Sequence, residues 1–127
     1  MSHVLIVDDD QGIRETIRLV LEDTDHHVME VSDGEQALHL LRESPVPLVV
    51  LLDLLMPKVS GIEFLNTVNA DPRLKALHSI VLMTANRANL LQEVGPLLQE
   101  MHVEVIAKPF DIDSLLETVE RASQRHL

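Results

Sequence analysis

The stretch Leu48-Val49-Val50-Leu51-Leu52-Asp53 decides the fold of this chain, because five consecutive apolar residues end in one carboxylate. A short apolar run of this kind is typical of a strand buried on both faces, as in a parallel sheet covered by helices. Three further runs that are mostly apolar also end in polar side chains. They are residues 4–7 before Asp8 and Asp9, residues 80–83 before Thr84, and residues 103–107 before Lys108.

The polar residues that follow these runs would meet if the four runs are neighbouring parallel strands. The carboxyl ends of the strands would then form one edge of the sheet, and ligands of open α/β sheets bind at that edge. Neighbouring carboxylates repel one another unless a cation joins them, and sites made only of oxygen ligands suit Mg²⁺. The sequence therefore predicts a site for a phosphoryl group and a divalent metal.

The composition narrows the class of protein. The chain has 127 residues, of which 46% are hydrophobic, so we expect one domain with its own core over residues 1–127. Its formal net charge of −11 argues against direct binding of nucleic acid, because phosphate contacts need a basic surface. There is no cysteine, which excludes disulfides and thiolate ligands. We find no signal peptide or membrane span and expect a cytoplasmic protein.

Strands and amphipathic helices alternate along the chain, which is typical of βαβ units. A fifth, more exposed strand is expected at residues 27–32, and helices are expected to begin at Ser32 or Asp33, at Ser60 and at Asp111. Asp71-Pro72 is interpreted as the end of the third helix. Five strands and five helices predict a flavodoxin-like, doubly wound α/β domain with a parallel sheet of order 2-1-3-4-5.

This strand order places the candidate site residues side by side. Strand one would lie next to strand three, which brings Asp8 and Asp9 to Asp53, while Thr84 and Lys108 lie on the other flank of Asp53. An aspartate at a strand end can act as a nucleophile and form an acyl phosphate. A lysine and a hydroxyl opposite a metal ion could neutralise and bind the remaining phosphoryl oxygens. Asp10 is expected to face solvent or to cap the following helix.

These residues resemble the receiver domain of two-component response regulators, from about residue 3 to residue 120. The motifs that carry the resemblance are Val7-Asp8-Asp9, Asp53-Leu54-Leu55-Met56-Pro57 followed by Gly61, Thr84-Ala85, and Lys108-Pro109-Phe110. The resemblance implies that Asp53 accepts a phosphoryl group from a phosphohistidine of a sensor histidine kinase or a histidine phosphotransfer protein. The domain would then change a surface that binds a downstream protein.

The same resemblance implies a role for each of the other site residues. Asp9 and Asp53 would ligate Mg²⁺ directly, Asp8 would act largely through water, and the backbone carbonyl of Leu55 would add a ligand. Lys108 would pair with the phosphoryl group and precede a cis bond to Pro109. Thr84 would move toward phosphorylated Asp53 and carry the switch. Such a protein is not an enzyme in the usual sense, because it catalyses only its own phosphorylation and dephosphorylation.

The sequence also departs from the family pattern. Val105 stands where an aromatic residue is usual, and Met101-His102 replaces the usual Gly-Ala before the last strand. The fourth helix contains Gly95-Pro96, which predicts a kink or a second helix start at Pro96. These differences predict an atypical route for the signal. Leu55 and Asn86 would bracket the phosphoryl group, and the apolar Leu55 predicts slow self-dephosphorylation.

Two other functions are compatible with parts of this pattern. A receiver-like interaction module that works without phosphorylation would keep the fold but would not need Mg²⁺. An aspartate-nucleophile phosphohydrolase would use the same acyl phosphate, but its motif has a second aspartate at the position of Leu55, and the chain has no room for a cap domain. The seven histidines lack the spacing of metal ligands, so all are interpreted as surface residues.

Overall fold

The computed structural model describes residues 2–54, 60–85 and 87–124, and its centre is a sheet of five parallel strands. The strands are β1 (His3–Val7), β2 (His27–Val31), β3 (Val49–Asp53), β4 (Ser79–Thr84) and β5 (Glu104–Ala107). Their order is β2-β1-β3-β4-β5, and each neighbouring pair is parallel. The predicted flavodoxin-like order is therefore confirmed.

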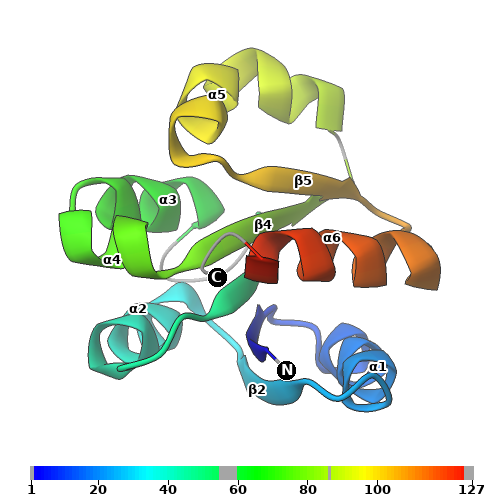
Figure 1. Cartoon of the computed structure of the whole chain (residues 1–127). Coiled ribbons are helices and arrows are strands. Elements are labelled where there is room, and N and C mark those ends of the chain that lie inside the picture. Colours follow the sequence, from blue (N-terminus) through cyan, green and yellow to red (C-terminus); the bar gives the residue numbers. More distant parts are fainter. Residues whose placement is uncertain (1, 55–59, 86, 125–127) are drawn as a thin grey trace.

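Helices cover both faces of the sheet (Figure 1). The helices are α1 (Gln11–Glu22), α2 (Gly34–Glu43), α3 (Gly61–Asn69), α4 (Pro72–Leu77), α5 (Arg87–Met101) and α6 (Ile112–Gln124). Helices α1 and α6 pack on one face against side chains such as Val4 and Ile6, whereas α2 to α5 pack on the other against Leu5 and Val7. Successive residues of β1 point to opposite faces, so a continuous apolar run is buried on both sides.

Among the described residues there are six helices, one more than the five that the sequence predicts. The addition is α4, which begins at the Asp71-Pro72 pair, where the sequence predicts the end of a helix. The Asp71 side chain accepts hydrogen bonds from the backbone N–H groups of Arg73 and Leu74, and Pro72 occupies the first turn. Proline is compatible with that position because its missing N–H would have no partner in the helix. The pair both follows α3 and starts α4.

The predicted helix caps are present in the structure. The side chains of Asp10, Asp33 and Ser60 accept hydrogen bonds from the backbone N–H of the residue three positions later. Asp111 accepts the backbone N–H of Ser114 at 2.7 Å. That hydrogen bond is the main reason why the pKa of Asp111 lies below its ordinary value. The caps fix where α1, α2, α3 and α6 begin, close to the sheet edge that carries the candidate site.

Helix α5 is kinked, as the sequence predicts. Val94 has non-helical backbone angles (φ −129°, ψ 18°), directly before Gly95-Pro96. The helix ends at Met101, and the next residue, His102, has a φ of 57°, in the left-handed region that favours glycine. The Val103 N–H donates to the carbonyl of Leu98 at 2.9 Å across this turn. At Met101-His102, where the sequence departs from the family pattern, a histidine therefore adopts a backbone conformation that is usually adopted by glycine.

The interpretation of every histidine as a surface residue is wrong for His78, which is 5% exposed. Its Nδ1 accepts the backbone N–H of Leu48 at 3.0 Å, and its Nε2 lies 3.0 Å from the carbonyl of Leu41. A neutral imidazole can accept at one nitrogen and donate from the other. His78 therefore joins the end of α2 to the start of β3 in the interior.

The surface agrees with the expected exposure of the second strand. No residue of β2 is buried, since this strand lies at one edge of the sheet.

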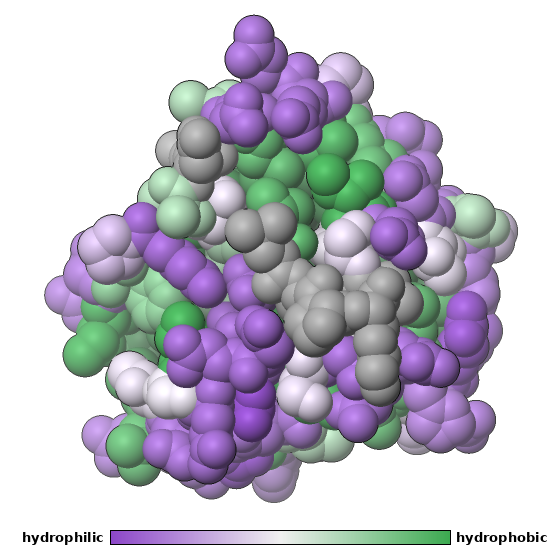
Figure 2. Space-filling model, turned by 180° about the vertical axis from the view of Figure 1, so that it is seen from behind, coloured by the Kyte–Doolittle hydropathy of each residue, from purple (hydrophilic) through white to green (hydrophobic). Residues whose placement is uncertain are grey.

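Seen from behind, the molecule is largely hydrophilic, and apolar residues gather in the upper part of the view (Figure 2). None of the described helices combines the length and the hydropathy that crossing a membrane would require.

Candidate functional site

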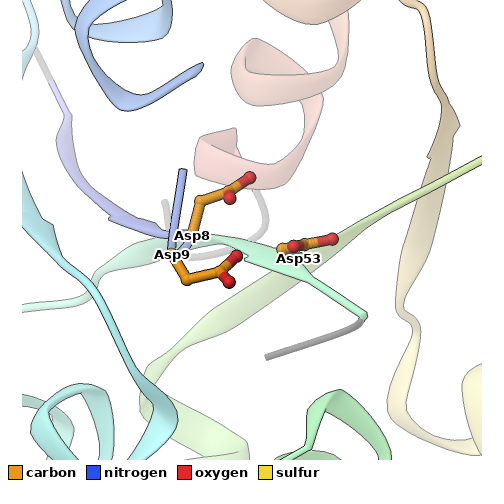
Figure 3. Close-up of side chains that lie close together, drawn as sticks. All are labelled: Asp8, Asp9 and Asp53. Carbon is orange, nitrogen blue, oxygen red and sulfur yellow. The ribbon is translucent and has the colours of Figure 1, made fainter. Parts of the chain in front are cut away.

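Three carboxylates meet at the carboxyl edge of the sheet. Asp8 and Asp9 directly follow β1, and Asp53 is the last residue of the neighbouring strand β3. One oxygen of each lies within 4.8 Å of the others, and the three side chains gather over the ends of the two strands (Figure 3). The pairing of β1 with β3 thus brings together residues that are more than forty positions apart in the sequence.

Asp8 is fully buried, and several of its polar groups have hydrogen-bond partners. Its Oδ1 accepts the backbone N–H of Asp10 at 2.9 Å, and its own N–H donates to the Val31 carbonyl at 3.3 Å. Its carbonyl accepts a hydrogen bond from Arg14 Nη1 at 2.7 Å. Asp9, the next residue, is exposed and offers its carboxylate to solvent.

Lys108 connects two of the three carboxylates. Its Nζ lies 3.3 Å from Asp53 Oδ1 and 3.4 Å from Asp8 Oδ2, and its side chain is 20% exposed. Its backbone N–H donates to the Thr84 carbonyl at 2.7 Å, and the Lys108–Pro109 peptide bond is cis. Lys108 directly follows β5, which lies on the far side of β4 from β3. Its ammonium is the one seen within the described part of the site.

Thr84 lies at the same edge and is 5% exposed. It is the last residue of β4, one position beyond Met83, which is in register with Asp53. Leu55 and Asn86, the other residues expected near the phosphoryl group, lie outside the described residues. Val105 lies on β5, next in the sheet to β4.

Sequence reasoning did not identify Arg14 as part of this region. Its guanidinium joins the Asp8 carbonyl to Glu30 on β2. The available signal was weak: two arginines, Arg14 and Arg18, stand four residues apart on one side of the first helix, and a glutamate interrupts the second strand.

The cluster fits a magnesium ion in charge and in donor type. Mg²⁺ takes oxygen ligands at about 2.0–2.1 Å, so two ligands can be at most about 4.2 Å apart. Oxygens within 4.8 Å of one another reach that geometry with small side-chain movements. The three carboxylates exceed the Lys108 ammonium by two formal charges, which a divalent cation would balance.

Comparison with known proteins identifies the family. Residues 4–120 match the family model described as the response regulator receiver domain. The chain belongs to the response regulator receiver family. Receiver domains are switches of two-component signalling that bind Mg²⁺ in an acidic site and interact with histidine kinases and downstream effectors.

Individual relatives agree with this assignment. A probable chemotaxis protein CheY of Rhizobium etli is 34% identical over 122 residues, which cover 92% of this receiver domain and 88% of that protein. The crystal structure of a CheY-like receiver domain protein from Methanospirillum hungatei is 33% identical and superposes with a TM-score of 0.82, covering 98% of this chain and 95% of that one. The response regulator TrrA of Thermotoga maritima, in complex with Mg²⁺-BeF, is 25% identical with a TM-score of 0.80, covering 96% and 99%.

Other relatives of this receiver domain are longer. The chain spans 54% and 58% of the length of two of them, a Streptococcus pneumoniae response regulator and a probable transcriptional regulator of Cyanophora paradoxa. Receiver domains therefore occur in this family within proteins of different lengths.

Proposed function

We propose that this chain acts in the cytoplasm and that Asp53 accepts a phosphoryl group from a phosphohistidine of a sensor histidine kinase or histidine phosphotransfer protein. Mg²⁺ would be held by Asp8, Asp9, Asp53 and the Leu55 carbonyl. The observation that carries the proposal is the position of Lys108 Nζ, 3.3 Å from Asp53 and 3.4 Å from Asp8. A lone aspartate at a strand end is usually only a helix cap. An aspartate that shares an ammonium with a second, buried aspartate in a cluster of three is suited to phosphoryl chemistry.

Asp53 would act as the nucleophile in this proposal. Its side chain is 13% exposed, and Lys108 Nζ lies 3.3 Å from its Oδ1. An Asp53 oxygen forms a bond to phosphorus, the P–N bond of the phosphohistidine breaks, and its electron pair stays on the imidazole nitrogen. Bound Mg²⁺ would neutralise charge on the phosphoryl oxygens in the transition state.

Lys108 and Thr84 would respond to the new phosphoryl group. The Lys108 ammonium, which contacts both Asp8 and Asp53, would turn toward a phosphoryl oxygen on Asp53. The Thr84 hydroxyl, buried at the end of the adjacent strand, would move toward the same group. Such a movement would favour one of two pre-existing conformations and change a protein-binding surface.

Intact mass spectrometry tests the proposal directly. The protein is incubated with acetyl phosphate with and without MgCl₂, alongside Asp53→Asn and the control Asp10→Asn. We expect a gain of one phosphoryl group that requires Mg²⁺ and is absent in Asp53→Asn. The gain should be retained in Asp10→Asn, because the Asp10 side chain caps α1 and asparagine can do the same. The decay of the phosphorylated mass also tests the slow dephosphorylation that Leu55 predicts. Failure of transfer from both acetyl phosphate and a phosphorylated kinase would overturn the proposal.

A further inference from the structure

Arg14 links the acidic cluster to the edge strand of the sheet. Its Nη1 donates to the Asp8 carbonyl at 2.7 Å, and its Nε donates to Glu30 Oε1 at 3.0 Å. The side chain is 15% exposed, so both hydrogen bonds are largely shielded from water. One guanidinium therefore holds a loop beside the candidate metal site and a residue of β2 at a fixed separation.

The bond to Asp8 acts on the peptide unit that leads into Asp9. The Asp8 carbonyl belongs to the peptide that joins these two residues, and the other polar groups of Asp8 already have partners in Val31, Asp10 and Lys108. Arg14 therefore restrains the plane of that peptide at its carbonyl. The direction in which the exposed Asp9 leaves the strand depends on this plane.

Arg18 provides a natural comparison within the same helix. Its Nε donates to Glu30 Oε2, the other oxygen of the carboxylate that holds Arg14, and its Nη1 lies 3.4 Å from Glu22 Oε2. These contacts do not reach the loop that carries the acidic cluster. The two arginines thus share one carboxylate, but only Arg14 is seen in contact with the peptide before Asp9.

We propose that Arg14 is a positioning residue for the divalent-cation site: by fixing the Asp8–Asp9 peptide against Glu30, it orients the Asp9 carboxylate toward the cation. The inference rests on the proposed function, because it assumes that the cluster binds Mg²⁺. Groups that orient metal ligands in this indirect way typically change affinity tenfold or more when they are lost.

The positive charge of Arg14 and its proposed positioning of Asp9 predict opposite effects on the affinity for Mg²⁺. If Arg14 acted only as a positive charge, removing it would tighten Mg²⁺ binding, because two cations repel each other. If it positions Asp9, loss of the hydrogen bond weakens binding. Arg14→Lys separates the two effects, because lysine keeps the charge but lacks the planar fork that reaches Glu30 and the carbonyl together.

Isothermal titration calorimetry with MgCl₂ at constant ionic strength provides the measurement. We expect the dissociation constant of Arg14→Lys to rise roughly tenfold, and that of the matched control Arg18→Lys to stay within about twofold. With acetyl phosphate, Arg14→Lys should need more Mg²⁺ but reach nearly the wild-type rate at saturation. A variant that had lost its structure would not reach the wild-type rate at any concentration of Mg²⁺.

The outcomes separate the two proposals. If wild type itself binds no Mg²⁺, the proposed function fails. If wild type binds and Arg14→Lys binds equally or more tightly, or Arg18→Lys is weakened as much, the role of Arg14 is overturned alone. Should Arg14→Lys not fold, Glu30→Gln serves instead: it weakens the anchor of Arg14 while the guanidinium remains, and must weaken Mg²⁺ binding, whereas unchanged binding refutes the inference.

Discussion

Lys108 is the residue on which the charge balance of the cation-free site depends. Lys108→Met would leave buried Asp8 and nearby Asp53 without their shared ammonium. We expect the free energy of unfolding in EDTA to fall by about 2 kcal/mol, less than for a fully buried pair because water reaches this edge. Mg²⁺ should bind more tightly to the variant because a competing cation is gone. Urea unfolding followed by circular dichroism, in EDTA and in MgCl₂, measures both effects.

A second lysine controls for the loss of a charge. Lys75 Nζ lies 3.7 Å from Glu100 Oε1, and both side chains are about a third exposed or more. Exposed pairs of this kind contribute little, so Lys75→Met should change the free energy of unfolding by less than about 1 kcal/mol. Equal unfolding midpoints for the two variants in EDTA would contradict the assigned role of Lys108.

The titration of His26 should make the free energy of unfolding depend on pH. Burial lowers its pKa below 6.5, although the carboxylates of Glu120 and Asp25 act in the opposite direction. Its Nδ1 is buried without a hydrogen-bond partner in the part of the chain that the structure describes. Because the unfolded chain binds this proton more readily, stability is complete above 6.5 and declines as the pH falls through the folded-state pKa.

His26→Gln should therefore reduce the loss of stability on mild acidification. Urea midpoints at about pH 7.5 and about pH 5.5 give the comparison, above the range in which most carboxylates titrate. His39→Gln removes an exposed histidine and serves as the control. If the urea midpoint changes between the two pH values by the same amount in His26→Gln as in wild type, His26 is not the source of the pH dependence.

At the scale of elements, the junction between β3 and α3 depends on Gly61. A Cβ at this position would lie 2.9 Å from both the Cα and the carbonyl oxygen of Leu54, which are backbone atoms that cannot turn aside. The Gly61 N–H also donates to that carbonyl at 3.0 Å. Gly61→Ala should cost about 2 kcal/mol of folding free energy and weaken Mg²⁺ binding, because Leu54 directly follows Asp53.

Gly95 supplies the matched control for the same substitution. A Cβ there would have no atom within 4 Å, so Gly95→Ala should change the free energy of unfolding by less than about 1 kcal/mol. Urea unfolding and Mg²⁺ calorimetry on the two variants test the contrast. Similar losses in both would mean that the contact with Leu54 does not limit the junction.

The elements that the sequence predicted well are those with a clear period or a strong cap. Apolar runs such as residues 48–52 identified the strands, and the strand order then followed from the alternation with helices. Helix α4 was missed because six residues are too short to show a helical period. Its capping pair, Asp71-Pro72, is equally consistent with the end of one helix and the start of the next.

The grouping of Asp8, Asp9, Asp53 and Lys108 could be predicted because it depends only on strand order. The bridge made by His78 could not, since a sequence does not show which backbone groups will lack partners in the interior. The same holds for the contact between Arg14 and Glu30, which requires α1 to pack against β2 so that these two residues lie next to each other. Side-chain bridges between elements thus depend on tertiary geometry rather than on local pattern.

At the scale of the whole molecule, the formal charge of −11 opposes folding through repulsion between like charges, and three of the carboxylates meet at the acidic edge of the sheet. Salt screens the distributed repulsion, because at about 0.1 M the screening length falls to about 10 Å. NaCl should therefore raise the free energy of unfolding modestly in wild type and in any variant with a similar charge. A cation held at the site adds a separate contribution, because it binds the folded state alone.

These two contributions can be separated by comparing MgCl₂ with NaCl at equal ionic strength. At about a hundred times its dissociation constant, Mg²⁺ should add about 2.7 kcal/mol beyond screening in wild type. Asp9→Asn should abolish most of this excess, since Asp9 is an exposed member of the cluster. Asp10→Asn should retain it, because asparagine also caps helices. Equal effects of the two salts on wild type would show that magnesium acts on the molecule only by screening its charge.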